Sequence, residues 1–353
     1  MPRVKAFLSR KEADPMLDEH ELRALGIIPW QDCAADFAGA DLLLGNGFSV
    51  NLTGVFSYGS LFDKFLTLCD PAYAAVLRGF GTSNFESILE DLGTTKRVNT
   101  LLALPSSPVR DLADAVREGL VATIEQVHPR KANVNWRRLE RIAQSFDEFG
   151  NVFTLNYDAL LYHIVMIAKE RDVPNRITRY NDYFWERISV DHLRFMGFQN
   201  YPYKHLYYLH GALFLFTLVS DNFDETEVKR STSGNNELLD AIASAIRSGN
   251  LPLFVSEGTS AEKRRAIESS PYLRFANDHL RANRDRLVIY GASLGDQDAH
   301  IAEAINSSTE RAAISIYVGN KSGRELTREL KQMKAELFGV DDPVFFDSST
   351  LFV

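Results

Sequence analysis

Three short apolar segments of this 353-residue chain each end at small or polar residues, and this pattern constrains the fold more than any other feature. Each segment has the length of a buried strand. In open α/β sheets, ligands bind in the crevice at the carboxyl ends of the strands. The pattern therefore predicts a parallel sheet with a ligand site along one edge. The segments and the residues that follow them are Leu42–Leu44 with Gly45-Asn46-Gly47-Phe48-Ser49, Phe153–Leu155 with Asn156-Tyr157-Asp158, and Tyr207–Leu209 with His210-Gly211.

Strand-like and helix-like segments alternate over most of the chain, which favours an α/β fold with a Rossmann-like, mostly parallel sheet and helices on both faces. We expect an N-terminal extension over residues 1–39 and one α/β domain over 40–353. Apolar residues recur at helical spacing from about 84 to 149, which predicts an all-helical insertion of three helices. The polar segment 220–236 is predicted to be a loop or poorly ordered. Further strands are expected at 177–180, 213–219, 253–255, 287–290, 313–318 and 344–346.

Composition argues against several classes of function. The net charge is −8, from 39 basic and 47 acidic residues, so no direct nucleic-acid binding is expected. The two cysteines, Cys33 and Cys69, cannot supply a four-thiolate zinc site and suit a reducing compartment. The first residues lack an apolar signal-peptide core, and no apolar run is long enough to span a bilayer. We expect a cytoplasmic protein with no membrane contact.

Turns of small residues that follow predicted strands could cradle a phosphate. The first lacks the third glycine of the G-x-G-x-x-G loop, because Val50 stands there, so a dehydrogenase loop is not predicted. An ordinary strand-to-helix turn explains this segment equally well. Similar turns follow the strands expected at 253–255 and 287–290, and Asp298 beyond the latter also suits a helix N-cap. The candidate binding residues are Gly45, Asn46, Gly47, Ser49, Gly291, Ser293 and Asp298.

Asn156, Asp158 and His210 are the candidate catalytic residues. An amide at the sheet edge can orient a ribose hydroxyl or a water, which is the role predicted for Asn156, with Asp158 in support. Both residues also suit capping of the next helix, and taken alone this structural interpretation is favoured. His210 suits proton transfer near neutral pH, although a histidine at a strand end is more often structural. Glu86, on the first helix of the insertion, is a weaker candidate.

Taken in order along the chain, these motifs resemble the NAD-binding domain of sirtuins. That family carries a GAG-type phosphate loop, a TQNID-type motif, an HG motif and a late GTS-type motif. The resemblance spans roughly residues 41–320, and the helical insertion lies where family members carry one. The matching residues, in the order of those motifs, are Gly45, Gly47 and Ser49, then Asn156 and Asp158, then His210-Gly211, then Gly291-Ala292-Ser293.

Two departures narrow the resemblance. The four zinc-binding cysteines of sirtuin deacylases are absent, and Val50–Thr53 replaces their GIPDFR-like segment. The sequence is more similar to the zinc-free, sirtuin-like domains of bacterial antiphage defence systems, which are generally NAD glycohydrolases. The resemblance implies that NAD is the substrate and that a partner protein or homo-oligomer controls the activity. No metal is required, and the sequence shows no cluster of metal ligands.

Two alternatives to NAD hydrolysis stay open from the sequence. The first is a catalytically silent sensor or partner subunit that binds NAD or ADP-ribose. The second is an ADP-ribosyltransferase, which performs the same cleavage with a macromolecular acceptor in place of water.

Overall fold

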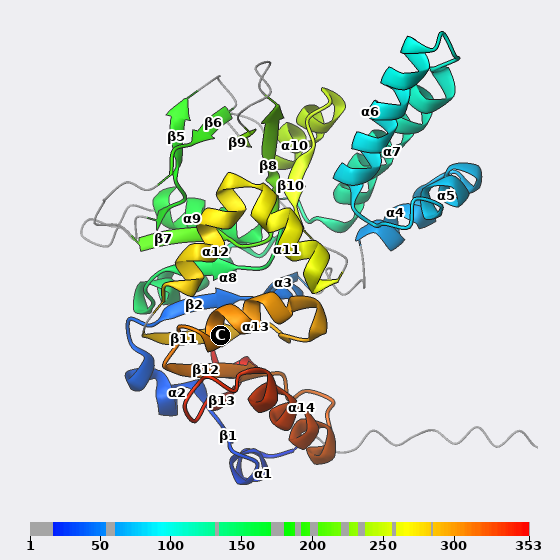
Figure 1. Ribbon diagram of the computed structural model, residues 1–353. Coiled ribbons are helices and arrows are strands. Elements are labelled where there is room, and N and C mark those ends of the chain that lie inside the picture. The colour runs from blue at the N-terminus through cyan, green and yellow to red at the C-terminus, as the bar shows by residue number, and fades with distance from the viewer. Residues whose placement is uncertain are drawn as a thin grey trace, which may run out of the picture.

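The chain is built around an eight-stranded sheet in which every pairing between described strands is parallel, in the order β1-β13-β12-β11-β2-β3-β7-β4 (Figure 1). The predicted fold class is therefore confirmed. The computed structural model describes residues 17–53, 61–130, 134–170, 180–187, 192–197, 204–219, 226–231, 237–255, 259–283 and 285–352. The strands are β1 (Ile27–Ile28), β2 (Asp41–Leu44), β3 (Val152–Thr154), β4 (Tyr180–Asn181), β7 (Lys204–Tyr208), β11 (Arg286–Tyr290), β12 (Arg311–Ile316) and β13 (Val344–Asp347).

Helices cover both faces of this sheet, and the central strands alternate their side chains between two apolar cores. Leu42 and Leu44 of β2 belong to one core, whereas Leu43 belongs to the other. All three are fully buried, which explains why this strand is an unbroken apolar run. The helices are α1 (Glu19–Ala24), α2 (Trp30–Cys33), α3 (Asn46–Thr53), α4 (Leu61–Leu68), α5 (Pro71–Arg78), α6 (Phe85–Leu101), α7 (Ser107–Val127), α8 (Trp136–Ser145), α9 (Leu160–Glu170), α10 (Leu238–Arg247), α11 (Ser260–Ser269), α12 (Pro271–Arg281), α13 (Ala299–Asn306) and α14 (Gly323–Glu336).

The centre of the sheet contains a topological switch point between β2 and β11. From β2 the sheet continues through β3 to β7, whereas from β11 it continues through β12 to β13 on the other side. Leu44 lies opposite Tyr290 on one side and Thr154 on the other, so the carboxyl ends of β11, β2 and β3 lie level. The turns that follow β2 and β11 lie at this point, which is where open α/β sheets bind their ligands.

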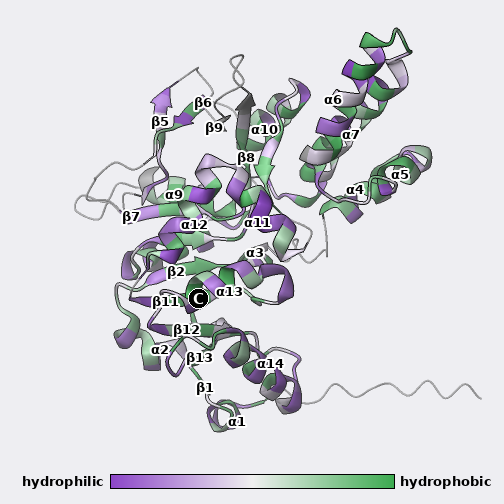
Figure 2. Ribbon diagram, in the orientation of Figure 1, coloured by the Kyte–Doolittle hydropathy of each residue, from purple (hydrophilic) through white to green (hydrophobic). Residues whose placement is uncertain are grey.

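The described chain between β2 and β3 forms helices, as predicted for the insertion. Helices α6 and α7 form a hairpin that projects away from the sheet, whereas α8 packs against α9 (Figure 1). On α7, Leu112, Val116, Leu120 and Ile124 are all buried, as their helical spacing requires. The helices that cover the sheet are amphipathic. An example is α14, which carries both hydrophilic and hydrophobic residues along its length (Figure 2).

A second, antiparallel sheet was not predicted from the sequence. It has the order β10-β8-β9-β6-β5 and includes a strand at 226–231, so the prediction for the segment 220–236 was wrong at these residues, while the rest of the segment lies outside the described residues. That strand has the sequence Thr-Glu-Val-Lys-Arg-Ser and lacks an apolar pattern. It forms because β8 and β6 pair with it on both sides. The strands are β5 (Phe184–Arg187), β6 (His192–Phe195), β8 (Gly211–Val219), β9 (Thr226–Ser231) and β10 (Pro252–Phe254).

The segment 1–39 is not wholly an extension. Residues 1–16 lie outside the described residues, but β1 pairs with β13 at the edge of the main sheet. The backbone N–H of Trp30 also donates to Oγ1 of Thr350 at 2.7 Å. Residues from Ile27 onward therefore belong to the α/β domain. Within the described chain, no helix has the length and apolar character needed to cross a membrane.

Candidate active site

A cavity of about 380 Å³ opens at the carboxyl edge of the sheet, at the switch point. This volume lies within the range of small-molecule sites. All the candidate binding and catalytic residues except Ser49 line this cavity. The structure does not describe the side chain of Glu86, the weaker candidate. The lining residues are Gly45, Asn46, Gly47, Leu155, Asn156, Tyr157, Asp158, His210, Val255, Lys263, Gly291, Ala292, Ser293, Gln297 and Asp298.

The turn after β2 packs directly against the turn after β11, and the glycines of both turns allow this close contact. The N–H of Gly45 donates to the carbonyl of Tyr290 at 2.9 Å, and that of Gly47 donates to the carbonyl of Gly291 at 2.8 Å. A Cβ on Gly45 would lie 2.5 Å from Cα of Ala292, so only glycine fits there. Because both N–H groups are engaged, these two glycines shape the cavity and their own amides are not available to a phosphate.

Ser49 takes part in a buried network behind the cavity and does not face a ligand, contrary to its predicted role. Nδ2 of Asn156 donates to the carbonyl of Gly45 at 2.9 Å and to Oγ of Ser49 at 3.0 Å. The Ser49 hydroxyl in turn donates to Oδ2 of Asp158. Both amide hydrogens of Asn156 are thereby used, so its Oδ1 is the side-chain atom left for a ligand.

Asp158 acts partly as the helix cap that its position suggests. Its Oδ1 accepts a hydrogen bond from the N–H of Leu160, the first residue of α9, at 2.8 Å. Burial raises the pKa of the Asp158 carboxyl, although the hydrogen bonds from Ser49 and Leu160 act in the opposite direction. Asp158 is therefore bonded within the loop around Asn156 and at the start of α9.

His210 lies at the cavity wall in contact with His300, which the sequence analysis missed. The Nε2 atoms of the two rings are 3.0 Å apart, and Nδ1 of His300 lies 3.2 Å from Oγ of Ser260. Burial lowers the pKa of His210 to about 3 and that of His300 to about 4, so both rings are neutral near pH 7. A neutral imidazole has a lone pair that can accept a hydrogen bond or a proton, but the lowered pKa makes His210 a weaker base than an ordinary histidine.

Asp298 is paired with a buried lysine and does not cap α13 with its side chain. Its Oδ1 accepts a hydrogen bond from Nζ of Lys263 at 2.8 Å and lies 4.0 Å from Nε2 of His210. Burial alone raises the pKa of Asp298, but the nearby His210 and Lys263 outweigh this and hold it below its ordinary value. The carboxylate is therefore charged at the edge of the cavity, and Lys263 balances that charge.

The expectation that the chain offers no cluster of metal ligands was wrong. One ligand atom each of His210, Asp298 and His300 lies within 4.8 Å of the other two. The residues come from β7–β8 and from the start of α13, so their separation along the chain hid the grouping. The ammonium of Lys263 already provides the positive charge beside this carboxylate, and a divalent ion would have to compete with it.

The buried histidines predict that stability falls in mild acid. Burial lowers the pKa of His128 to about 4, in addition to the lowered pKa values of His210 and His300 given above. The ordinary pKa of histidine is about 6.5, so between about pH 4 and 6.5 the unfolded chain binds protons that the folded chain does not. Each histidine should then lower the free energy of unfolding by up to about 1.4 kcal/mol per pH unit as the pH falls. The raised pKa of Asp158 gives a slope of opposite sign, because the folded chain then holds a proton that the unfolded chain has lost.

Thermal unfolding between pH 5 and pH 7 measures this effect. The melting temperature should fall toward pH 5, and the fall should be smaller in the variant His128→Gln, which removes one titrating group. A melting temperature that is constant over this range would contradict the prediction.

Comparison with known proteins now places the chain in a family. Residues 42–352 match a family described as Domain of unknown function (DUF4917). This chain belongs to that family. The matched region contains the sheet from β2 to β13, the helical insertion and every residue that lines the cavity. No curated protein matches the sequence.

Proposed function

We propose that this member of the DUF4917 family is an NAD glycohydrolase, which cleaves the bond between nicotinamide and ribose to give nicotinamide and ADP-ribose. One observation carries the proposal: Asn156 and the neutral His210 both line one cavity at the switch point of a parallel sheet. The resemblance of the ordered motifs to sirtuin-like domains supports the same assignment.

The position of the cavity supports a dinucleotide ligand. Parallel sheets of this type bind dinucleotides across the crevice between diverging loops, with phosphates near a helix N-terminus. Here α3 begins at Asn46, in the wall of the cavity, and the exposed Ser293 adds a hydroxyl on the other side of the crevice. We assign the pyrophosphate to the part of the cavity between the start of α3 and Ser293, with Asn46 and Ser293 as its contacts.

The proposed reaction breaks the bond between ribose C1′ and the nicotinamide nitrogen, and the electron pair leaves with nicotinamide. Water then bonds to C1′ and gives up a proton. Oδ1 of Asn156 can accept a hydrogen bond from the attacking water or a ribose hydroxyl and so fix its position. His210 can take the released proton, and the charge of Asp298, 4.0 Å away, stabilises the imidazolium that results.

Incubation of the purified full-length chain with NAD tests the proposal, with free nicotinamide and ADP-ribose measured by chromatography. Release of both products in equal amounts is expected, and NADP in a parallel reaction reports which dinucleotide the site prefers. Binding of NAD without turnover would instead indicate a sensor or partner subunit. ADP-ribose found on a protein or nucleic acid would indicate a transferase. Absence of both binding and turnover would overturn the proposal.

A cellular role accompanies this activity. We propose that the protein depletes NAD as an antiphage effector, under the control of a partner protein or of its own assembly. Cellular NAD should then fall during phage infection in cells that express the wild-type chain, and should stay constant in cells that express His210→Gln. Equal NAD levels in the two strains would contradict this role.

A further inference from the structure

His210 and His300 form a hydrogen-bonded pair inside the wall of the cavity. Their ring centroids are 5.2 Å apart and their planes are inclined by 30°. Both residues are buried, with exposed fractions of 4% and 2%. Because their Nε2 atoms are 3.0 Å apart, one must donate and the other accept. The position of the proton on one neutral ring therefore determines its position on the other.

The charge of Asp298 favours one direction of this hydrogen bond. A negative charge favours a proton on the nearer ring nitrogen, and Oδ1 of Asp298 lies 4.0 Å from Nε2 of His210. Nε2–H of His210 then donates to Nε2 of His300, which must carry its own proton on Nδ1. That Nδ1–H meets Oγ of Ser260 at 3.2 Å, and the same oxygen also accepts the backbone N–H of His300 at 3.1 Å.

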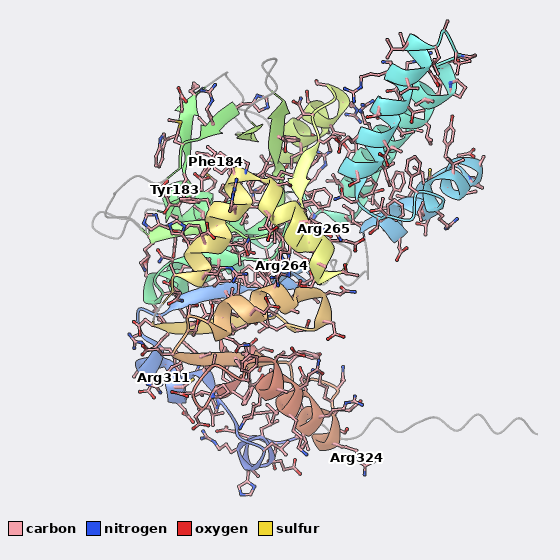
Figure 3. The ribbon with its side chains drawn as sticks, in the orientation of Figure 1. Tyr183, Phe184, Arg264, Arg265, Arg311 and Arg324 are labelled. Carbon is pink, nitrogen blue, oxygen red and sulfur yellow. The ribbon has the colours of Figure 1, made fainter. Side chains whose placement is uncertain are left out.

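Two ion pairs hold these groups in place. Lys263, on α11, contacts the Asp298 carboxylate at 2.8 Å and is itself buried. Arg264, the next residue, pairs with Glu303 and so ties α11 to α13, the helix that carries His300. Figure 3 labels Arg264 on α11. The buried pair of Lys263 with Asp298 links α11 to the residue that precedes α13, and the two helices also contact each other.

We propose that His300 is a positioning residue for His210: it accepts the Nε2 proton and leaves Nδ1 of His210, with its lone pair, for the ligand. The inference rests on the proposed function, because it assigns the tautomer that a proton-accepting His210 needs. In the opposite arrangement, Ser260 donates to His300 and His300 donates to His210. Nδ1 of His210 would then carry a hydrogen and could not accept a proton from the ligand.

The tautomer can be measured without NAD cleavage. In full-length protein labelled with ¹⁵N-histidine, long-range ¹H–¹⁵N spectra report which nitrogen of each ring is protonated, and the His210→Gln and His300→Leu variants assign the signals. We expect His210 to carry its proton on Nε2 in the wild type and to populate both tautomers in His300→Leu. A proton on Nδ1 in the wild type, or an unchanged pattern in His300→Leu, would overturn the inference.

Kinetics then test the role in catalysis. His300→Leu should lower kcat for NAD cleavage about 10- to 100-fold with little change in KM, the range found when a partner that orients a functional histidine is lost. His300→Gln keeps an acceptor oxygen and should recover part of the rate. The control His279→Leu removes a histidine that stacks on Tyr207 and should keep the wild-type rate.

The spectra and the kinetics together distinguish a failure of the proposed function from a failure of the positioning role of His300. If the wild type does not cleave NAD, the proposed function fails, yet the spectra still show whether His300 sets the tautomer of His210. If the wild type cleaves NAD and His300→Leu is folded with unchanged kcat, the positioning role fails while the proposed function stands. Thermal melting of each variant shows whether it is folded.

Discussion

The variant His210→Gln is expected to cleave NAD about 100- to 10,000-fold more slowly than the wild type, the range for loss of a general acid or base. Glutamine fills a similar volume and can hydrogen bond to His300, but it cannot take up a proton. KM should change little, because the ring contributes more to proton transfer than to binding. Initial rates of nicotinamide release at saturating NAD measure the effect.

The matched control for this variant is His279→Gln on α12. His279 is partly buried, and its Nδ1 lies 2.8 Å from the carbonyl of Phe275, but it does not line the cavity. Its replacement should leave nicotinamide release unchanged. Equal rates for His210→Gln and the wild type would remove His210 from the mechanism, whereas equal losses in both variants would indicate a general loss of structure.

The fold was predictable wherever the signal was local. Apolar runs such as Leu42–Leu44, followed by glycine, identify a buried parallel strand and its turn without any knowledge of partners. The strand Thr226–Ser231 gave no such signal, because pairing with β8 and β6, not its own pattern, determines its conformation. The antiparallel sheet was missed for this reason.

In the candidate site, likewise, the residues with a local sequence signal were predictable and the others were not. Residues that directly follow strands share one sheet edge, so Asn156 and His210 could be placed together from the sequence. His300 and Lys263 could not, because they reach the cavity from helices whose packing the sequence does not specify. One signal was available: Lys263 lies four residues before Ile267 on the buried face of α11. A lysine at such a position needs a charged partner, and the structure shows that this partner is Asp298.

The variant Gly291→Ala is expected to destabilise the fold and to weaken NAD binding at the same time. Gly291 has a φ of +70°, and an added Cβ would lie 2.6 Å from the backbone nitrogen of Phe48 and 2.8 Å from Cα of Gly47. A left-handed conformation costs a residue with a side chain roughly 1–2 kcal/mol, and forcing extra volume into packed backbone adds about 1–3 kcal/mol. We expect a loss of about 3 kcal/mol in the free energy of unfolding, measured by urea denaturation.

Gly295→Ala is the control, because it makes the same chemical change in the same loop. A Cβ on Gly295 would have no heavy atom within 4 Å, and its φ of −69° suits any residue. This variant should keep the stability of the wild type. In Gly291→Ala the turns after β2 and β11 must move apart, so NAD affinity should fall even at temperatures where the protein stays folded. If both variants unfold at the same urea concentration, the close packing of these two turns does not stabilise the fold, and the glycine at 291 is not required by its contacts.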